Sequence, residues 1–234
     1  MDVLGLLPRL HLLRFPVGQA YLWRDDDALT LVDAGLIGAG PAIAEAVRGL
    51  GHAPRDVRRI VLTHFHEDHA GGAGEFAALS GAEVLAHRLD APFVRGELPG
   101  PPPRFEEWEL PVHAAVAGHL PRGRPLPPPS VTELADGDVL SFGGGAQVLH
   151  VPGHTDGSIA LFLPAEGVLF TGDTVAASPA DGTVVPGVFN LDRPRLLASL
   201  SRLARLDADV ACFGHGAPVL HGARAALRAA TAGA

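Results

Sequence analysis

The chain has 234 residues, and 18 Lys and Arg residues against 26 Asp and Glu residues give it a formal net charge of −8. This length fits one large domain or two small ones, and a composition that is 47% hydrophobic excludes a disordered chain. The acidic balance disfavours a nucleic-acid partner, because binding to nucleic acid normally requires a basic face. The most unusual feature is the presence of 12 histidines in a chain with one tyrosine.

Cysteine usage and hydropathy exclude further classes of protein. Cys212 is the single cysteine, so a disulfide framework and a cysteine-based metal site are both excluded. We interpret it as a small core residue. Prolines and charged residues interrupt the leucine-rich first 18 residues, so neither a normal secretory signal nor a membrane span is visible. We therefore expect a cytoplasmic protein with no membrane partner.

The first half of the chain alternates predicted strands and helices. The leucines before residue 14 predict an edge strand, a homodimer contact or ordinary core packing. An apolar run predicts a buried strand over residues 28–32, which pairs with residues 21–23 across an acidic turn. A starting proline and a following glycine predict a helix over residues 41–50. The pattern further predicts a strand at 59–62, a helix at 74–79 and a strand at 82–86.

Proline density separates the middle of the chain from both halves. Residues 92–129 hold 11 of the 21 prolines, which cannot occupy helix interiors or central strands. We interpret residues 91–130 as an insertion with one short helix, which acts either as a wall of the substrate cleft or as a solvent-exposed linker. Its aromatic residues Phe105 and Trp108, with Phe93, either contact substrate or pack the insertion onto the domain.

Regular structure resumes at residue 139. Apolar runs predict strands at 147–151, 158–163 and 168–171, and leucines at helical spacing predict an amphipathic helix over 193–206. A strand at 210–213 and a helix at 223–230 complete the chain. We expect one domain spanning residues 1–234.

The segment Thr63-His64-Phe65-His66-Glu67-Asp68-His69-Ala70-Gly71-Gly72 indicates a metal site, because it places four potential ligands directly after a buried strand. His64 and His66 are two residues apart, so in extended backbone their rings project to the same side. Asp68 and His69 are adjacent and point differently, which suits a neighbouring ion. Glycines 71 and 72 let the backbone turn closely around whatever is bound.

Three more polar residues follow apolar runs, each beside a glycine: His154, Asp173 and His215. An apolar run that ends in this way delivers the side chain to one edge of a sheet. Imidazole and carboxylate ligands without a thiolate suit Zn²⁺, Mn²⁺ or Fe ions. Seven ligands exceed one four-coordinate ion, so the set predicts two ions bridged by a carboxylate.

These residues resemble the metallo-β-lactamase superfamily, whose His-x-His-x-Asp-His motif matches His64, His66, Asp68 and His69. The family's later His, bridging Asp and final His match His154, Asp173 and His215 in the right order. The resemblance extends over nearly the whole chain. It implies an α/β fold in the form of an αββα sandwich, in which two mixed sheets pack face to face with helices on both outer sides.

The resemblance also implies how the ligands divide between two divalent ions, for which zinc is favoured over manganese or iron. One ion takes His64, His66 and His154, and the other takes Asp68, His69 and His215. Asp173 and a hydroxide bridge the two ions. The bound water is present as hydroxide because metal coordination lowers its pKa from 15.7 toward about 7. Asp33 either orients a ligand histidine from behind, without touching a metal ion, or caps a turn.

Differences between this sequence and individual branches of the family narrow the range of activities that the resemblance implies. The β-lactamases lack a bridging Asp where Asp173 stands, so antibiotic hydrolysis is disfavoured. Glyoxalase II has the same Pro-Gly-His-Thr and Thr-Gly-Asp-Thr stretches, but it carries a C-terminal domain for glutathione, whereas 19 residues follow His215 here.

The lactonases use a Tyr shortly after the bridging Asp, and the single tyrosine of this chain is Tyr21. The tRNA-processing nucleases carry a basic arm that suits an acidic chain poorly.

We therefore expect a binuclear metallo-hydrolase that cleaves an ester, thioester or lactone of a small molecule. The bridging hydroxide attacks the carbonyl carbon, the second ion stabilises the oxyanion or leaving group, and Asp68 accepts a proton after the attack as well as being a ligand. The alternative is an oxygenase similar to persulfide dioxygenases, with one iron held by His64, His154 and Asp173.

Overall fold

The computed structural model describes residues 1–119 and 123–233, so residues 120–122 of the predicted insertion lie outside the described residues. The chain divides into two compact units. The first unit comprises Met1–Gly100 and Val116–Leu134, and the second comprises Pro101–Ala115 and Ala135–Ala234. This division leaves the single-domain expectation as a prediction.

The first unit contains a seven-stranded sheet whose strands lie side by side in chain order. The strands are β1 (Asp2–Leu7), β2 (Leu10–Arg14), β3 (Gln19–Arg24), β4 (Leu29–Val32), β5 (Val57–Val61), β6 (Glu83–His87) and β7 (Thr132–Leu134). β1 to β4 pair antiparallel, whereas β4 to β7 pair parallel, so the sheet is mixed. β1 is an edge strand of this sheet, as one interpretation of the N-terminal leucines predicted, and Leu10, Leu12 and Leu13 of β2 are buried in the core, as another predicted. The homodimer contact stays a prediction.

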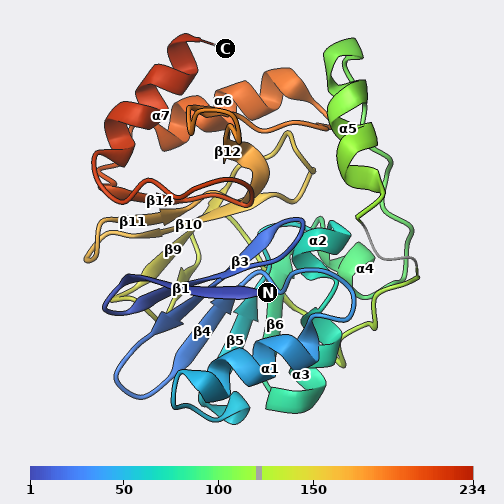
Figure 1. Cartoon of the computed structure of the whole chain (residues 1–234), viewed down its shortest axis with the longest axis vertical. Coiled ribbons are helices and arrows are strands. Elements are labelled where there is room, and N and C mark those ends of the chain that lie inside the picture. The colour runs from blue at the N-terminus through green and yellow to red at the C-terminus, as the bar shows by residue number, and fades with distance from the viewer. Residues whose placement is uncertain (120–122, 234) are drawn as a thin grey trace. The chain divides into compact units, whose positions relative to one another are not determined.

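Two helices pack on one face of this sheet. Figure 1 shows α1 (Gly40–Gly49) and α3 (Ala73–Ser80) side by side below the strands. Ile43 of α1 and Phe76 of α3 are fully buried in one apolar cluster with Leu31 and Ile60 of the sheet. Because side chains alternate between the faces of a strand, this packing turns the intervening residues to the opposite face. Shorter helical segments are η1 (Pro54–Asp56), α2 (Glu67–Ala70) and α4 (Ala91–Val94).

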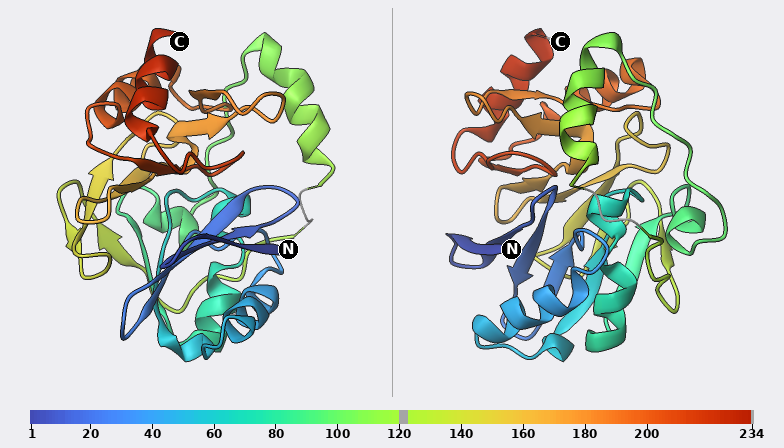
Figure 2. Two further views of the ribbon diagram at one scale, coloured as in Figure 1. Left: turned by 60° about the vertical axis from the view of Figure 1, so that its left-hand side comes forward. Right: turned by 45° about the vertical axis from the view of Figure 1, so that its right-hand side comes forward.

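The second unit is built on a five-stranded mixed sheet in the order β14-β11-β10-β9-β8. The strands are β8 (Val139–Leu140), β9 (Ala146–His150), β10 (Ile159–Leu163), β11 (Val168–Phe170) and β14 (Val210–Cys212). A small ribbon of β12 (Val175–Ala177) and β13 (Val184–Pro186) follows η3 (Gly172–Thr174). Figure 2 shows α6 (Arg193–Leu203) and α7 (Ala223–Ala232) together on one side of this unit. Leu200 and Leu227 of these helices pack against Phe162 and Phe213.

The predicted insertion contains more helix than the sequence indicated. α4, η2 (Glu107–Glu109) and α5 (Leu110–Ala117) all lie in it. Pro92 and Pro111 each stand in the first turn of a helix, where a missing backbone N–H costs no hydrogen bond, so proline density did not exclude these helices.

The fold class is confirmed, because the chain forms two large mixed sheets, each flanked by helices. The predicted elements are all present, with ends that differ by at most three residues. The short strands β7, β8, β12 and β13, each of two or three residues, were not predicted. Across residues 1–119 and 123–233, no helix is long and apolar enough to cross a bilayer.

Candidate metal centre

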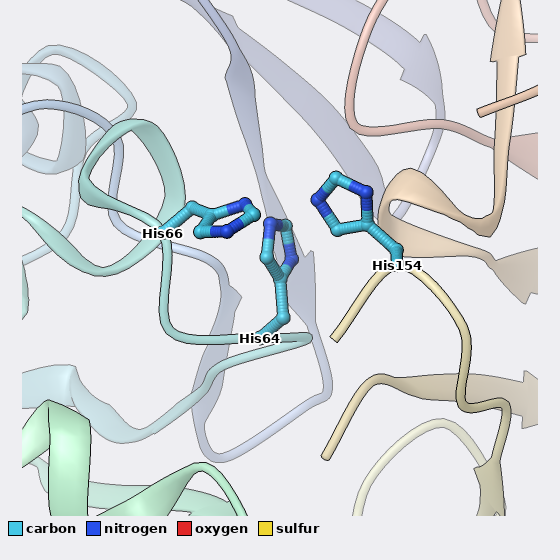
Figure 3. A group of neighbouring side chains, drawn as sticks. All are labelled: His64, His66 and His154. Atoms are coloured by element: carbon cyan, nitrogen blue, oxygen red, sulfur yellow. The ribbon is translucent and has the colours of Figure 1, made fainter. Parts of the chain in front are cut away.

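The first unit places His64 and His66 on the loop that follows β5. Their ring centroids lie 4.8 Å apart at an interplanar angle of 85°, in agreement with the expectation that both rings project to one side. Figure 3 shows these two rings beside each other, rising from the same stretch of backbone, together with the predicted ligand His154. His64 is buried and His66 is partly exposed.

Asp33 connects this loop to the strand beside it. β4 and β5 are parallel neighbours, so the residues that follow them meet at the same edge of the sheet. The Asp33 carboxylate accepts hydrogen bonds from the Thr63 backbone N–H at 2.7 Å and from the Thr63 hydroxyl at 2.8 Å. Its Oδ2 also lies 2.9 Å from Nδ1 of His69. Asp33 therefore orients a predicted ligand, which agrees with the first of its two interpretations.

The same network determines which nitrogen of His64 carries the proton. Nδ1 of His64 lies 3.0 Å from Oγ1 of Thr63. The Thr63 hydroxyl donates its one hydrogen to Asp33, because an ionised carboxylate can only accept. Nδ1 of His64 must therefore be the donor to Thr63, and the lone pair of the ring lies on Nε2, the nitrogen available to a metal ion.

Asp68 and His69 lie on the single turn of α2, which begins after His66. The fully buried His69 donates from Nδ1 to Asp33, so its lone pair is also on Nε2, which lies 3.6 Å from Oδ2 of Asp68. Desolvation, and to a smaller degree the charge of Asp68, raise the pKa of the neighbouring Glu67 carboxyl. α2 thus carries two neighbouring carboxyl groups, those of Glu67 and Asp68.

Gly71 and Gly72 serve a different purpose from the one that we expected. A Cβ atom at Gly71 would lie 2.4 Å from the backbone nitrogen of Ile37, and one at Gly72 would lie 2.4 Å from the Ala34 oxygen. Neither distance is compatible with a side chain. The two glycines therefore allow close packing against the backbone that follows β4, and through it hold α2 beside Asp33.

In the second unit, His154 follows β9 and is almost completely buried. Its Nδ1 lies 3.1 Å from the carbonyl oxygen of Val188 and 3.3 Å from Oδ1 of Asn190. The amide nitrogen of Asn190 donates to the Gly187 oxygen at 2.8 Å, which orients Oδ1 toward the ring. Both neighbours of Nδ1 are acceptors, so Nδ1 carries the proton and Nε2 carries the lone pair.

Asp173 and His215 follow two other strands of this sheet, β11 and β14, which are parallel neighbours and end at the same edge. Oδ2 of Asp173 lies 3.5 Å from Nε2 of His154 and 3.2 Å from Nε2 of His215. Two imidazole nitrogens thus lie near one carboxylate oxygen.

The donor chemistry of these residues fits divalent cations. His and Asp side chains form groups able to hold a metal ion in the described part of the chain, and every member belongs to the seven predicted ligands. Neutral imidazoles with an available Nε2, accompanied by carboxylates, suit Zn²⁺, Mn²⁺ or Fe ions. Cys212 is fully buried, and burial raises the pKa of its thiol, in agreement with its interpretation as a core residue.

Several contributors to these networks were missed by sequence reasoning. Thr63 stands next to a predicted ligand, but its role depends on Asp33, 30 residues earlier in the chain. Asn190 and the Val188 carbonyl reach His154 from a loop with no metal-ligand motif. Glu109 has no local sequence signal, although its buried carboxylate accepts a hydrogen bond from Phe189, 80 residues away.

The aromatic residues singled out as substrate contacts divide between the two units. Phe93 packs on Phe65 with ring centroids 4.7 Å apart, and Phe65 in turn contacts the ring of His66. Phe105 packs against Phe189, while Trp108 is half exposed. Packing within the first unit accounts for Phe93 without a substrate contact. In the second unit, part of the surfaces of Phe105 and Trp108 stays accessible.

Comparison with known proteins gives one consistent family. Residues 13–215 match the family model described as the metallo-beta-lactamase superfamily. The chain is 27% identical over 232 residues to the probable metallo-hydrolase YqjP of Bacillus subtilis (strain 168), covering 88% of this chain and 69% of that protein. It is 31% identical over 200 residues to a hydroxyacylglutathione hydrolase of Rhodobacter capsulatus.

That second match covers 84% of this chain but 61% of the hydroxyacylglutathione hydrolase, so the chain spans less than two thirds of that relative. Among solved structures, a metallo-beta-lactamase family protein from Thermus thermophilus is 31% identical, with a TM-score of 0.70. This match covers 98% of this chain and 80% of the other.

Proposed function

Because the chain belongs to the metallo-beta-lactamase superfamily, we propose that it is a hydrolase that cleaves an ester, thioester or lactone of a small molecule at a two-metal centre. The observation that carries the proposal is the shared orientation of three buried histidines. His64, His69 and His154 each direct Nδ1 to an oxygen of the protein, which reserves Nε2 for a ligand.

In the proposed centre, the seven ligands form two groups with one shared member. One group comprises His64, His66 and His154, the other comprises Asp68, His69 and His215, and Asp173 is shared. Both triads are among the groups of His and Asp side chains able to hold an ion, which supports this division. The convergence of His154 and His215 on one oxygen of Asp173 supports its shared role.

Bound divalent ions supply Lewis acidity and a water molecule of lowered pKa. The residues of the chain position that chemistry. Asp33 and Thr63 hold the imidazoles in one tautomer, so no rearrangement of protons precedes substrate binding. Asp68, whose carboxylate is partly exposed, takes up the proton released after attack on the carbonyl carbon.

The proposed substrate carries an acyl group, and several observations support this class. Some curated relatives are named hydroxyacylglutathione hydrolases, which are thioesterases by that name. The half-exposed Trp108 and the partly exposed Phe105 offer an apolar surface on the insertion, suited to one wall of a substrate cleft. Zinc is the proposed metal, and the cytoplasmic location and the absence of nucleic-acid and membrane partners stay predictions.

Metal analysis of the purified protein tests the two-metal proposal. We expect about two zinc or manganese ions per chain, with activity and metal both lost in His66→Ala and Asp173→Ala. His119→Ala is the matched control, because His119 is exposed and outside the proposed centre. Full activity in either ligand variant would contradict the proposal, and one iron per chain would favour the oxygenase instead.

A substrate panel tests the proposed class. We expect hydrolysis of p-nitrophenyl esters, lactones or glutathione thioesters by protein of known metal content, and no hydrolysis of phosphodiesters. Replacing Trp108 by Ala is expected to raise KM for the best acyl substrate without lowering kcat, because the residue offers binding surface and no proton. Activity confined to phosphodiesters would refute the proposed substrate class.

A further inference from the structure

Glu109 is a buried carboxylate outside the proposed ligand set. It ends η2 in the insertion, and 1% of its surface is exposed. Its two oxygens accept hydrogen bonds from two backbone amides, the local Glu106 N–H at 2.9 Å and the distant Phe189 N–H at 3.0 Å. An ionised carboxylate is stable in such a position only when it is well hydrogen-bonded. The contact with Phe189 therefore ties the insertion to the loop that follows β13.

Phe189 has a backbone conformation that requires support from its surroundings. Its φ angle is +60°, which is a strained outlier for a bulky residue. The insertion makes two hydrogen bonds to this segment. Glu109 accepts from the Phe189 N–H, and the Arg104 N–H donates to the carbonyl oxygen of the following residue, Asn190, at 3.2 Å. Strained backbone held in this way often belongs to a functional site.

The peptide group held by Glu109 also contacts His154. The N–H of Phe189 and the C=O of Val188 belong to the same planar peptide unit. The N–H donates to Glu109, and the C=O accepts from Nδ1 of His154 at 3.1 Å. The result is a continuous chain of hydrogen bonds from carboxylate to peptide to imidazole, whose members polarise one another.

We propose that Glu109 is a positioning residue that orients the ligand His154 through the Val188–Phe189 peptide group. In the first unit, the carboxylate of Asp33 contacts His69 directly at 2.9 Å. In the second unit, the carboxylate of Glu109 does the same for His154 through one intervening peptide. The insertion thereby contributes to the metal centre as well as to the substrate wall. This inference rests on the proposed function, because it assigns a role toward a proposed ligand.

Two measurements on the full-length protein test the role of Glu109. Zinc affinity is measured by competition with a chromophoric chelator, and the tautomer of His154 is read from long-range ¹H–¹⁵N correlations of its ring in chelator-treated protein. We expect Glu109→Ala to weaken zinc binding about 10-fold and to reduce the population of the Nδ1–H tautomer. Glu109→Gln should have a smaller effect, because its amide oxygen can still accept from Phe189. Glu107→Ala is the matched control, since Glu107 is exposed in the same turn.

The two readouts separate a failure of this inference from a failure of the proposed function. Zinc affinity and His154 signals identical to wild type in Glu109→Ala would overturn the inference, even if the melting temperature fell. If the wild-type protein binds no zinc, the proposed function fails, while the ring signals of the metal-free protein still decide the role of Glu109. If Glu109→Ala does not fold, the same comparison is made with Glu109→Gln.

Discussion

At the scale of single residues, the orientation of the site histidines depends on the oxygen atoms that their Nδ1 atoms contact. The Asp33 side chain accepts hydrogen bonds from the amide and hydroxyl of Thr63 and from the ring of His69. It lies directly after β4, with a φ angle of +61° that aspartate tolerates better than most side chains. One buried carboxylate thus sets the orientation of two histidines, one directly and one through Thr63.

Asp33→Asn is the sharpest test of this arrangement. The asparagine amide can accept at one atom only, so at least one donor among Thr63 and His69 loses its partner. We expect the free energy of unfolding to fall by about 1–3 kcal/mol and zinc affinity to fall about 10–100-fold. Denaturant unfolding and chelator competition measure the two effects. Asp27→Asn, an exposed change, is the control. Zinc affinity equal to wild type would show that Asp33 serves the fold alone.

The ligand residues could be predicted from the sequence because their spacing and flanking glycines are local features. His64, His66, Asp68 and His69 lie within six consecutive positions, so their clustering needs no tertiary information. The partners of Nδ1 could not be predicted in this way. Asn190 and Glu109 act across 36 and 80 residues of chain, and nothing near them in the sequence marks the contact.

At the scale of secondary structure elements, parallel strand pairs position the site. β4 and β5 bring Asp33 beside Thr63, and β11 and β14 bring Asp173 beside His215. α6 packs so closely against the loop before His154 that no side chain fits at Gly153. A Cβ atom there would lie 2.2 Å from the backbone nitrogen of Leu196, and the φ angle of +137° is accessible to glycine almost alone.

Gly153→Ala is therefore expected to destabilise the protein by about 3 kcal/mol or more, because it combines backbone strain with a clash against α6. Gly182→Ala is the matched control, since Gly182 also has a positive φ angle but no atom within 4 Å of the added Cβ. That control should cost about 1 kcal/mol. Denaturant unfolding checks both values, and equal losses in the two variants would contradict the predicted clash.

The long elements were predicted with ends that differ by at most three residues, because each carries a full period of apolar residues. The insertion was predicted less well. Its helices α4, η2 and α5 are short, and the prolines of α4 and α5 stand in first turns, where the rule that proline breaks helices does not apply.

At the scale of the whole molecule, metal binding is expected to stabilise the fold, because an ion that binds the folded chain more tightly than the unfolded chain shifts the equilibrium toward the folded state. Zinc at 100 times its dissociation constant should add about 2.7 kcal/mol, which corresponds to a rise in melting temperature of about 5–10 °C over chelator-treated protein. Asp173→Ala should lose this rise, and His119→Ala should keep it. Thermal unfolding with and without zinc measures the difference. An equal rise in Asp173→Ala would place the stabilising ion elsewhere.

The residue types, their order and the glycines beside them were sufficient to recognise the family and the chemistry of the site, because metal ligation requires particular side chains at short spacings. The 12 histidines that first distinguished the composition are thereby partly explained. The tertiary structure decided which ring nitrogen of His64, His69 and His154 carries the proton. That choice depends on hydrogen bonds between Nδ1 and oxygens of Asp33, Thr63 and Val188, and such contacts exist only after strands and loops far apart in the chain have come together.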